Sequence, residues 1–506
     1  MSDAETANRQ TDGGLRASYA AVPYLTQARR RTHPTRIAAL ASLFGLDPAP
    51  CAGARIVELG CGTGENLAAI AAALPEANCV GIDLVPENIT QARHLAEAAG
   101  LKNLFFEVGD VRSLAAVHGA FDYAIAHGLF SWVTSETQDA FLRACRGAIA
   151  PHGVVYVSYN TYPGWHQRAV IRDAMLSAAS GIADEAERVR RGRQAIEAMV
   201  EALGTAEVPY AQALREQRDN VRKLADGHIA HDLMEANNNP VYFRNFVERA
   251  ERAGLRYVCE AALEWMVADN YPAGVRDLLS KEPDLLKREQ LLDFMINRTF
   301  RESLLCGPQA TPLVSPQPQR LASLWVSGTL KPEIPNVDLE APGRTLFVGA
   351  GNVRVAIDGA ISKAAILCLA DIYPEAVMLP ELVERARAKL GKTSVAPSEI
   401  VDVTRLIYAG YSKGLLDLTT AAPRVARTPG ERPAASVLAR AQFATGTIVG
   451  NLLVDNVNVD DALCRNLMPL LDGTRTRDQL AREVSADDAA IEDALKRLVS
   501  VGLIVS

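Results

Sequence analysis

The fold of the first part of this 506-residue chain is indicated by the stretch Arg55-Ile-Val-Glu-Leu-Gly-Cys-Gly-Thr-Gly-Glu-Asn66. An apolar segment runs directly into three glycines, Gly60, Gly62 and Gly64, and a helix-forming segment follows. Glycine at alternate positions lets the backbone approach a ligand where a side chain would collide. The stretch therefore predicts a strand, a ligand-binding turn and a helix.

The alternation of strand and helix continues beyond this motif. We expect further strands at 79–83, 104–108, 121–126 and 153–158, and helices at 66–74 and 86–99. Such alternation predicts a parallel sheet that is covered by helices on both faces. Candidate ligand residues follow the strands, at the edge where open α/β sheets bind their ligands.

The spacing that starts at Glu58, E-x-G-x-G-x-G, resembles that of class I S-adenosylmethionine (AdoMet) methyltransferases. The resemblance implies that Glu58 holds the amino end of the methionine moiety, Asp83 the ribose hydroxyls and Asp110 the adenine amino group. The full set of expected cofactor-binding residues is Tyr24, His33, Glu58, Gly60, Cys61, Gly62, Asn66, Asp83, Leu84, Asp110, Val111 and His127.

Each of these markers also has a purely structural interpretation. The glycine turn could be only a tight turn, and Asp83 could cap a helix. The main alternative cofactor, NAD, requires a third glycine three residues after the second and a loop that cradles a pyrophosphate. The combination of Glu58, Asp83 and Asp110 favours AdoMet, with S-adenosylhomocysteine (AdoHcy) as its product.

Two segments after the fourth and fifth strands are candidates for the methyl-acceptor side. The candidate catalytic residues in them are His127, Trp132, Tyr159, Asn160, Tyr162 and Trp165. His127 could orient the acceptor or act as a general base, or it could only shape its loop. The second segment, 158–166, could instead be a Pro-Gly turn with aromatic packing beneath it. The N-P-P-Y motif of many adenine amino methyltransferases is not present after the fourth strand.

Longer patterns resemble one group of bacterial methyltransferases that carry a methyltransferase regulatory domain. The patterns are T-H-P-x-R-I-A at 32–38, A-H-G-x-x-S-W-V at 126–133, Y-N-T-Y-P-G-W-H at 159–166, N-P-V-Y-F at 239–243 and R-E-Q-x-x-D-F-x-x-N-R-x-F-R at 288–301. Some members of the group are protein lysine methyltransferases. The resemblance covers about residues 19–306 and implies a Rossmann-like, seven-stranded sheet whose last strand is antiparallel. Residues 254–261 could supply a late strand.

The composition excludes several other classes of protein. A net charge of -7 argues against nucleic acid as a partner, because phosphate binding needs clustered Lys and Arg. Eight scattered cysteines without a C-x-x-C pair indicate reduced thiols in a cytoplasmic protein, and we predict no metal site. The polar stretch 1–14 does not resemble a signal peptide, and no apolar run is long enough to span a membrane.

The rest of the chain predicts further domains. We expect an N-terminal arm and lid at 1–45, an AdoMet-binding core at 46–164, and a helical insertion with dimer contacts at 165–235. A segment that completes the core follows at 236–306, then a Pro-rich linker at 307–345 and winged-helix-like domains at 346–420 and 437–506. The last domain holds 7 Lys and Arg against 10 Asp and Glu, which favours protein or peptide docking over DNA binding.

We therefore expect an AdoMet-dependent methyltransferase that acts on a protein or peptide, with lysine amines as the expected methyl acceptors. Large additional domains favour a macromolecular substrate, since a small molecule needs only a pocket. One alternative is an N- or O-methyltransferase of small molecules or natural products, including ribosomal peptides. Another is a scaffold that binds AdoMet without catalysis.

Overall fold

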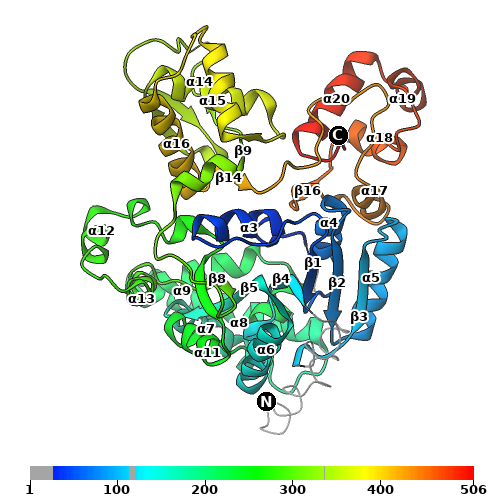
Figure 1. Cartoon of the computed structure of the whole chain (residues 1–506). Helices are drawn as coiled ribbons and strands as arrows, with labels where there is room; N and C mark the ends of the chain where they lie inside the picture. Colours follow the sequence, from blue (N-terminus) through cyan, green and yellow to red (C-terminus); the bar gives the residue numbers. More distant parts are fainter. Residues whose placement is uncertain (1–26, 113–119, 336, 506) are drawn as a thin grey trace.

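The centre of the protein is a mixed β-sheet (Figure 1). The computed structural model describes residues 27–112, 120–335 and 337–505. The strands of this sheet are β1 (Arg55–Leu59), β2 (Asn78–Asp83), β3 (Leu104–Val108), β4 (Phe121–Ala126), β5 (Ile149–Tyr162), β7 (Arg256–Glu260) and β8 (Phe300–Cys306), with the two-residue β6 (Val241–Tyr242) beside β5. Their order is β3-β2-β1-β4-β5-β8-β7, in which β1 to β5 are parallel.

The antiparallel strand of the sheet is β8, which runs against both β5 and β7. The prediction of a seven-stranded Rossmann-like sheet with an antiparallel last strand is confirmed, and 254–261 supplies β7. The fifth strand is longer than the predicted 153–158, because its far end pairs with β8 up to Asn160.

Helices cover both faces of the sheet. Alternate side chains of β1 point to opposite faces, so that Ile56 and Val57 belong to two separate apolar cores. One core includes the helices α3 (Pro34–Leu43), α4 (Glu65–Ala73) and α5 (Pro86–Ala98); the other includes α6 (Ser135–Ala148) and α11 (Phe243–Arg252).

The glycine turn has the geometry that the sequence predicts. Gly60, Gly62 and Gly64 have φ angles of 70°, 55° and 87°, a region that L side chains rarely adopt. A Cβ atom on Gly64 would also lie 2.6 Å from Cζ of Phe106. Only glycine allows β1 to turn here and α4 to pack closely on the sheet.

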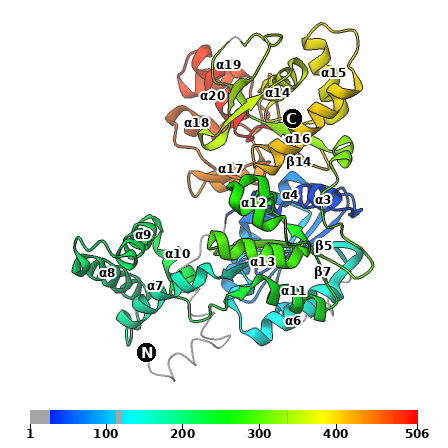
Figure 2. The same cartoon turned by 90° about the vertical axis from the view of Figure 1, so that its left-hand side faces the viewer.

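The helical insertion projects from the sheet domain (Figure 2). It consists of α7 (Gly164–Ala178), α8 (Glu185–Leu203), α9 (Pro209–Lys223), α10 (Asp226–His228) and the π-helical turn η4 (Ile229–Leu233). These helices share an apolar core of their own, which includes Ile171, Val189 and Leu214.

A buried cation joins the next segment to the sheet. This segment adds the turns η5 (Leu263–Trp265) and η6 (Ala268–Asn270) and the helices α12 (Ala273–Leu279) and α13 (Leu285–Ile296). Arg301 of β8 is fully buried and binds Asp293 through two nitrogens, at 2.9 and 2.8 Å. It also binds Glu260 at 2.8 Å and Glu289 at 3.2 Å, and its guanidinium lies 3.9 Å from the ring centre of Phe243.

Two small modules follow, and Figure 1 shows them side by side above α3. The first C-terminal module (residues 318–420) contains η7 (Pro318–Ser323), β9 (Trp325–Gly328), β10 (Lys331–Pro332), β11 (Thr345–Val348), η8 (Ala350–Asn352), β12 (Arg354–Ile357), α14 (Ala360–Ile372), β13 (Val377–Met378), α15 (Leu379–Lys389), α16 (Pro397–Ser412) and β14 (Leu416–Thr419). The second C-terminal module (residues 434–505) contains α17 (Val437–Phe443), β15 (Ile448–Gly450), β16 (Asn456–Asn458), α18 (Ala462–Leu467), η9 (Met468–Leu470), α19 (Arg477–Val484) and α20 (Asp488–Ser500).

The Pro-rich segment 307–345 differs from the predicted linker. It contributes β9, which lies between β13 and β14 as the central strand of the first module. A strand of four residues, Trp-Val-Ser-Gly, is too short to show a period in the sequence. Its burial depends on partners that lie about 50 to 90 residues later in the chain.

All eight cysteines are buried and free. Burial raises the pKa of the Cys51 thiol to about 11, so that thiol is protonated at neutral pH. In the part of the chain that the structure describes, none of the helices combines the length and apolar character needed to cross a bilayer.

The Arg301 cluster predicts a large effect of one substitution. Arg301→Leu removes the nearest cationic partner of three buried carboxylates, of which Asp293 and Glu289 keep only the more distant Arg298, and should lower the free energy of unfolding by about 3–5 kcal/mol. The loss should shrink as the pH falls, because protonation neutralises the stranded carboxylates. Urea unfolding at neutral pH and at about pH 5 measures both effects.

The exposed pair of Arg354 and Glu333 provides the control for this experiment. Arg354→Leu should change stability by less than about 1 kcal/mol, as is usual for surface ion pairs. Equal effects of the two substitutions would contradict the role of Arg301.

Candidate active site

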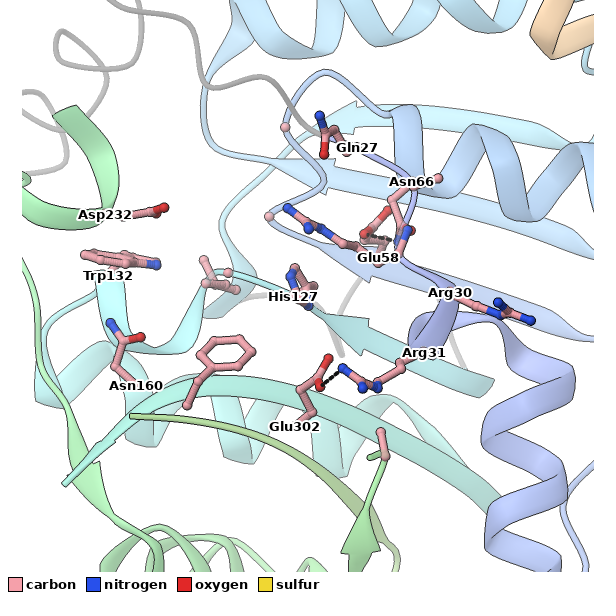
Figure 3. Close-up of a pocket in the computed structure, with 18 of the residues that line it drawn as sticks. Gln27, Arg30, Arg31, Glu58, Asn66, His127, Trp132, Asn160, Asp232 and Glu302 are labelled. Atoms are coloured by element: carbon pink, nitrogen blue, oxygen red, sulfur yellow. Dashed lines mark hydrogen bonds and ion pairs between the residues drawn. The ribbon is translucent and has the colours of Figure 1, made fainter. Parts of the chain in front are cut away.

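A cavity of about 1150 Å³ opens at the carboxyl ends of the parallel strands (Figure 3). It is bordered by the glycine turn, by the loops after β2, β3 and β4, and by the end of β5. The predicted site residues that line it are Glu58, Gly60, Cys61, Gly62, Asn66, Asp83, Leu84, Asp110, Val111, His127, Trp132, Asn160 and Trp165.

Glu58 is the buried carboxylate of the site. Its Oε1 accepts a hydrogen bond from Nδ2 of Asn66 at 2.7 Å. Its Oε2 is buried and has no hydrogen-bond partner among the described residues. Burial is the main cause that raises the pKa of Glu58 to about 8. Once Glu58 is ionised, a cationic or donor group of a ligand would satisfy this buried oxygen.

Asp83 is held rigidly by its own turn. Its carboxylate accepts hydrogen bonds from the amides of Gly62 and Val85, both at 2.9 Å, and from Nδ2 of Asn88 at 3.3 Å. These three bonds leave part of the acceptor capacity of the two oxygens for a ligand hydroxyl. Asp83 does not cap α5, whose N-cap is Val85, but its carboxylate is held in a fixed orientation at the cavity.

Asp110 has a different environment. It lies at the rim of the cavity and forms an ion pair with Arg112. A ligand amino group that binds Asp110 shares the carboxylate with this guanidinium.

The residues at this end of the cavity fit AdoMet. The ammonium of its methionine moiety matches the unpartnered Glu58 oxygen, and its ribose hydroxyls match Asp83. The glycines of the turn leave space for the backbone to approach such a ligand. The predicted cofactor is thus compatible with the unpartnered Oε2 of Glu58 as well as with the sequence motif.

A chain of hydrogen bonds leads from His127 to the opposite wall. Nδ1 of His127 lies 3.0 Å from the hydroxyl of Tyr156, which donates to Oε1 of Glu302 at 2.6 Å. Glu302 also binds Arg31 at 3.0 Å. The Tyr156 hydroxyl donates its proton to Glu302, so it can only accept from His127. We therefore assign the His127 proton to Nδ1, which leaves Nε2 as an acceptor.

Burial lowers the pKa of His127 to about 3, with the charges of Arg29 and Arg31 as further causes. His127 is therefore neutral at physiological pH. So low a pKa makes the imidazole a poor proton acceptor but does not weaken its role as a hydrogen-bond acceptor.

Aromatic and amide side chains form the far end of the cavity, beyond His127 in Figure 3. Trp132 and Trp165 pack edge to face, with ring centres 6.5 Å apart. Nδ2 of Asn160 donates to Asn238 at 3.1 Å, which leaves Oδ1 of Asn160 without a partner among the described residues. His127 and Asn160 both line the cavity, and Nε2 of His127 and Oδ1 of Asn160 are their acceptor atoms that these bonds leave available.

Three predicted site residues do not line the cavity. Tyr159 points to the opposite face of the sheet, where its ring stacks on Phe246 at 4.0 Å, because neighbouring residues of a strand alternate in direction. Tyr162 stacks on His166 at 4.1 Å, outside the cavity. His33 caps α3, since its Nδ1 accepts the amide of Thr35 at 3.1 Å. The predicted Tyr24 lies outside the described residues.

Sequence reasoning missed residues that come from distant parts of the chain. Phe300 and Glu302 lie on the antiparallel β8, and Asp232 lies on the π-helical turn η4 of the insertion. Asp232 lines the far end of the cavity, beside Trp132 (Figure 3). Only the irregular helix turn marks Asp232 as a candidate, because such turns occur often at functional sites.

The segment 27–33, which we name the strap, closes the cavity above Glu58. Residues 27–31 line the cavity, and Arg30–Thr32 form the short helix η1. Oδ1 of Asn66 accepts hydrogen bonds from the amide of Arg29 at 2.8 Å and from the hydroxyl of Thr32 at 3.1 Å. The residue that binds Glu58 therefore also holds the strap.

Three family models match the chain. Residues 56–153 match a methyltransferase domain, residues 225–307 a predicted methyltransferase regulatory domain, and residues 431–497 a PKMT C-terminal winged helix domain. The last match coincides with most of the second C-terminal module.

The chain is also similar to known proteins. It is 34% identical to the uncharacterized protein RP789 of Rickettsia prowazekii over 57% of this chain and 52% of that protein, and so spans about half the length of this relative. It is 31% identical to the uncharacterized protein RP028 of the same organism, over 46% of this chain and 94% of RP028. The solved structure of PKMT2 from Rickettsia typhi has a TM-score of 0.85 at 24% identity and covers 96% of this chain and 100% of that one; a second structure of PKMT2 contains AdoHcy with the same values.

The raised pKa of Glu58 predicts how ligand binding depends on pH. In the free protein Glu58 carries a proton below about pH 8, whereas the ligand ammonium requires the carboxylate. Binding of AdoHcy should therefore release a proton, and its affinity should rise by up to about tenfold per pH unit from about pH 6 toward pH 7.5. Titration calorimetry in two buffers of different ionisation enthalpy measures the released proton.

Glu58→Gln should bind AdoHcy more weakly and without proton release, whereas Glu76→Gln, at an exposed position, should behave as the wild type. Wild-type binding with an affinity that does not change over this pH range would contradict the assignment of Glu58.

Proposed function

The chain belongs to the family that includes RP028 of Rickettsia prowazekii, and we propose that it is an AdoMet-dependent methyltransferase that modifies lysine side chains of a protein. The methyltransferase domain, the PKMT winged helix domain and the fold shared with PKMT2 support the proposal. The observation that carries it is one cavity with two differently built ends, joined at His127.

The cofactor end is built for the ammonium and ribose of AdoMet. Glu58 supplies the buried carboxylate oxygen, and Asp83 supplies the oriented acceptor beside the glycine turn. AdoMet itself supplies the electrophilic methyl group and its leaving group. The protein then has to position an acceptor, exclude water and let the acceptor nitrogen lose its proton.

The acceptor end fits a neutral amine. Its two N–H groups can donate to Nε2 of His127 and Oδ1 of Asn160, which leaves the lone pair free for attack. Trp132 and Trp165 would enclose the aliphatic part of a lysine side chain, and aromatic faces tolerate the positive charge before and after transfer. His127 is too weak a base to deprotonate an ammonium ion, so water is the proposed acceptor of that proton.

Other features support a protein as the substrate rather than a metabolite. The cavity is larger than one cofactor needs and reaches from the glycine turn to the helical insertion and to the first C-terminal module. We propose that the insertion also forms dimer contacts and that the protein acts in the cytoplasm, which the eight free thiols support. We further propose that the enzyme does not bind nucleic acid.

His127→Phe tests the orienting role of the imidazole. The substitution keeps a ring of similar size but removes the acceptor nitrogen. We expect kcat to fall roughly tenfold to a hundredfold, because a poorly oriented nucleophile attacks rarely. Steady-state kinetics with a lysine-containing protein substrate measures the effect, and unchanged kcat would exclude the orienting role.

The proposed reaction is tested with radiolabelled AdoMet. The purified protein is incubated with fractionated cell protein and, separately, with metabolite extract, and peptide mass spectrometry locates the label. We expect methylated lysine in one or a few proteins and no label with Asp83→Asn. Asp402→Asn, exposed on α16, should retain full activity.

Each other result has a distinct meaning. Label only in a metabolite would contradict a protein substrate. AdoHcy binding without any label in either fraction would favour a non-catalytic scaffold.

A further inference from the structure

Three consecutive residues of the strap are each held by a different part of the molecule. Ala28 is held by the second C-terminal module, Arg29 by the glycine-turn helix α4, and Arg30 by the first C-terminal module. Figure 1 shows α3, which continues the strap, between the sheet and the two modules. The modules are thus in direct contact with the segment that closes the cofactor end of the cavity.

The second module contacts the strap through one side chain. Asn456 of β16 donates from Nδ2 to the carbonyl oxygen of Ala28 at 2.9 Å and accepts the amide of Ala28 on Oδ1 at 3.1 Å. One carboxamide therefore satisfies both backbone groups of a strap residue, as a neighbouring β-strand would. Asp455 adds a longer ionic contact to Arg30 at 3.9 Å.

The first module contacts the strap through a shared carboxylate. Asp417 of β14 forms ion pairs with both Arg30 of the strap and Arg36 of α3. The side chains of Asp417 and Arg36 are largely shielded from solvent, at 21% and 13% exposure. The amide of Thr420 also donates to the carbonyl oxygen of Thr35 at 3.1 Å. Burial reduces the screening of these charges by water and salt, and so strengthens the attraction between them.

On the cavity side the strap rests on Asn66, which binds Glu58. A ligand at Glu58 is therefore linked to the strap through Asn66, and through the strap to both modules, whose Asp417 and Asn456 also line the cavity. Ordering a backbone segment costs conformational entropy, and a binding site that is ordered in advance binds its ligand more tightly. The contacts from Asp417 and Asn456 order the strap in the free protein, so that less conformational entropy is lost when the ligand binds.

We propose that Asp417 and Asn456 are positioning residues of the cofactor site, through which the two C-terminal modules hold the strap over AdoMet. This inference rests on the proposed function, because it assumes that the cofactor binds beside Glu58. It gives the modules a role in cofactor retention in addition to substrate docking. Displacement of either module, for instance by a docked protein substrate, would open the strap and speed the exchange of AdoHcy for AdoMet.

The test measures binding of AdoHcy to the full-length protein. Asp417→Asn and Asn456→Ala should each raise the AdoHcy dissociation constant about tenfold, mainly through a faster dissociation rate. Stopped-flow displacement and titration calorimetry give the two quantities. In kinetics, KM for AdoMet should rise by a similar factor while kcat changes by less than about twofold.

Matched controls keep the modules intact. Asn458→Ala changes an exposed residue two positions along the same strand as Asn456, and Asp402→Asn changes an exposed acid of the first module. Both should bind AdoHcy as the wild type does. Hydrogen exchange of the free protein should show faster exchange at residues 28–32 in the two test variants only, with an unchanged melting temperature.

The outcomes separate this inference from the proposed function. A wild type that does not bind AdoHcy would overturn the proposed function itself. Wild-type binding with unchanged affinity and strap exchange in both variants would overturn only the role of the modules. Weaker binding together with a general fall in melting temperature would show that the two residues act on stability, and would also overturn the inference.

Discussion

The carboxamide of Asn66 is the interaction on which the cofactor end of this protein depends. Its nitrogen binds Glu58, and its oxygen binds the amide of Arg29 and the hydroxyl of Thr32. One planar group therefore binds both Glu58 and the strap, which lie on two sides of the cavity. Because a carboxamide has a donor and an acceptor at a fixed angle, neither an acid nor an apolar residue of the same size could make both contacts.

A second constraint fixes the sheet beneath the site. The antiparallel β8 carries Arg301 toward one face and Glu302 toward the other, as alternate residues of a strand do. Arg301 binds the acids of α13 and β7, whereas Glu302 orients Tyr156 and thereby His127. Two adjacent residues of β8 thus set both the packing of α13 on the sheet and the position of His127 in the cavity.

The sequence predicts the part of the site that lies within local units. Glu58 and Asp83 lie near the ends of single strands and Gly60 and Gly62 follow β1, so a strand-turn-helix pattern is sufficient to find them. Tyr159 and Asn160 were both predicted as site residues; both lie on β5, and the pleat of that strand decides that Asn160 faces the cavity while Tyr159 does not. Residues such as Glu302 and Asp232 reach the cavity through long-range pairing and an insertion, which no local pattern encodes. The strand β9 was missed because its partners lie far away in sequence.

The burial of all eight cysteines makes this chain a convenient host for spectroscopic probes. Thiol-reactive dyes and spin labels need an accessible thiolate, which a buried thiol with a raised pKa does not offer. A single cysteine placed on an exposed surface would therefore be labelled selectively, without prior removal of the native ones. Pairs of such labels, one on α16 and one on α5, would report the distance between a C-terminal module and the sheet domain in solution, molecule by molecule.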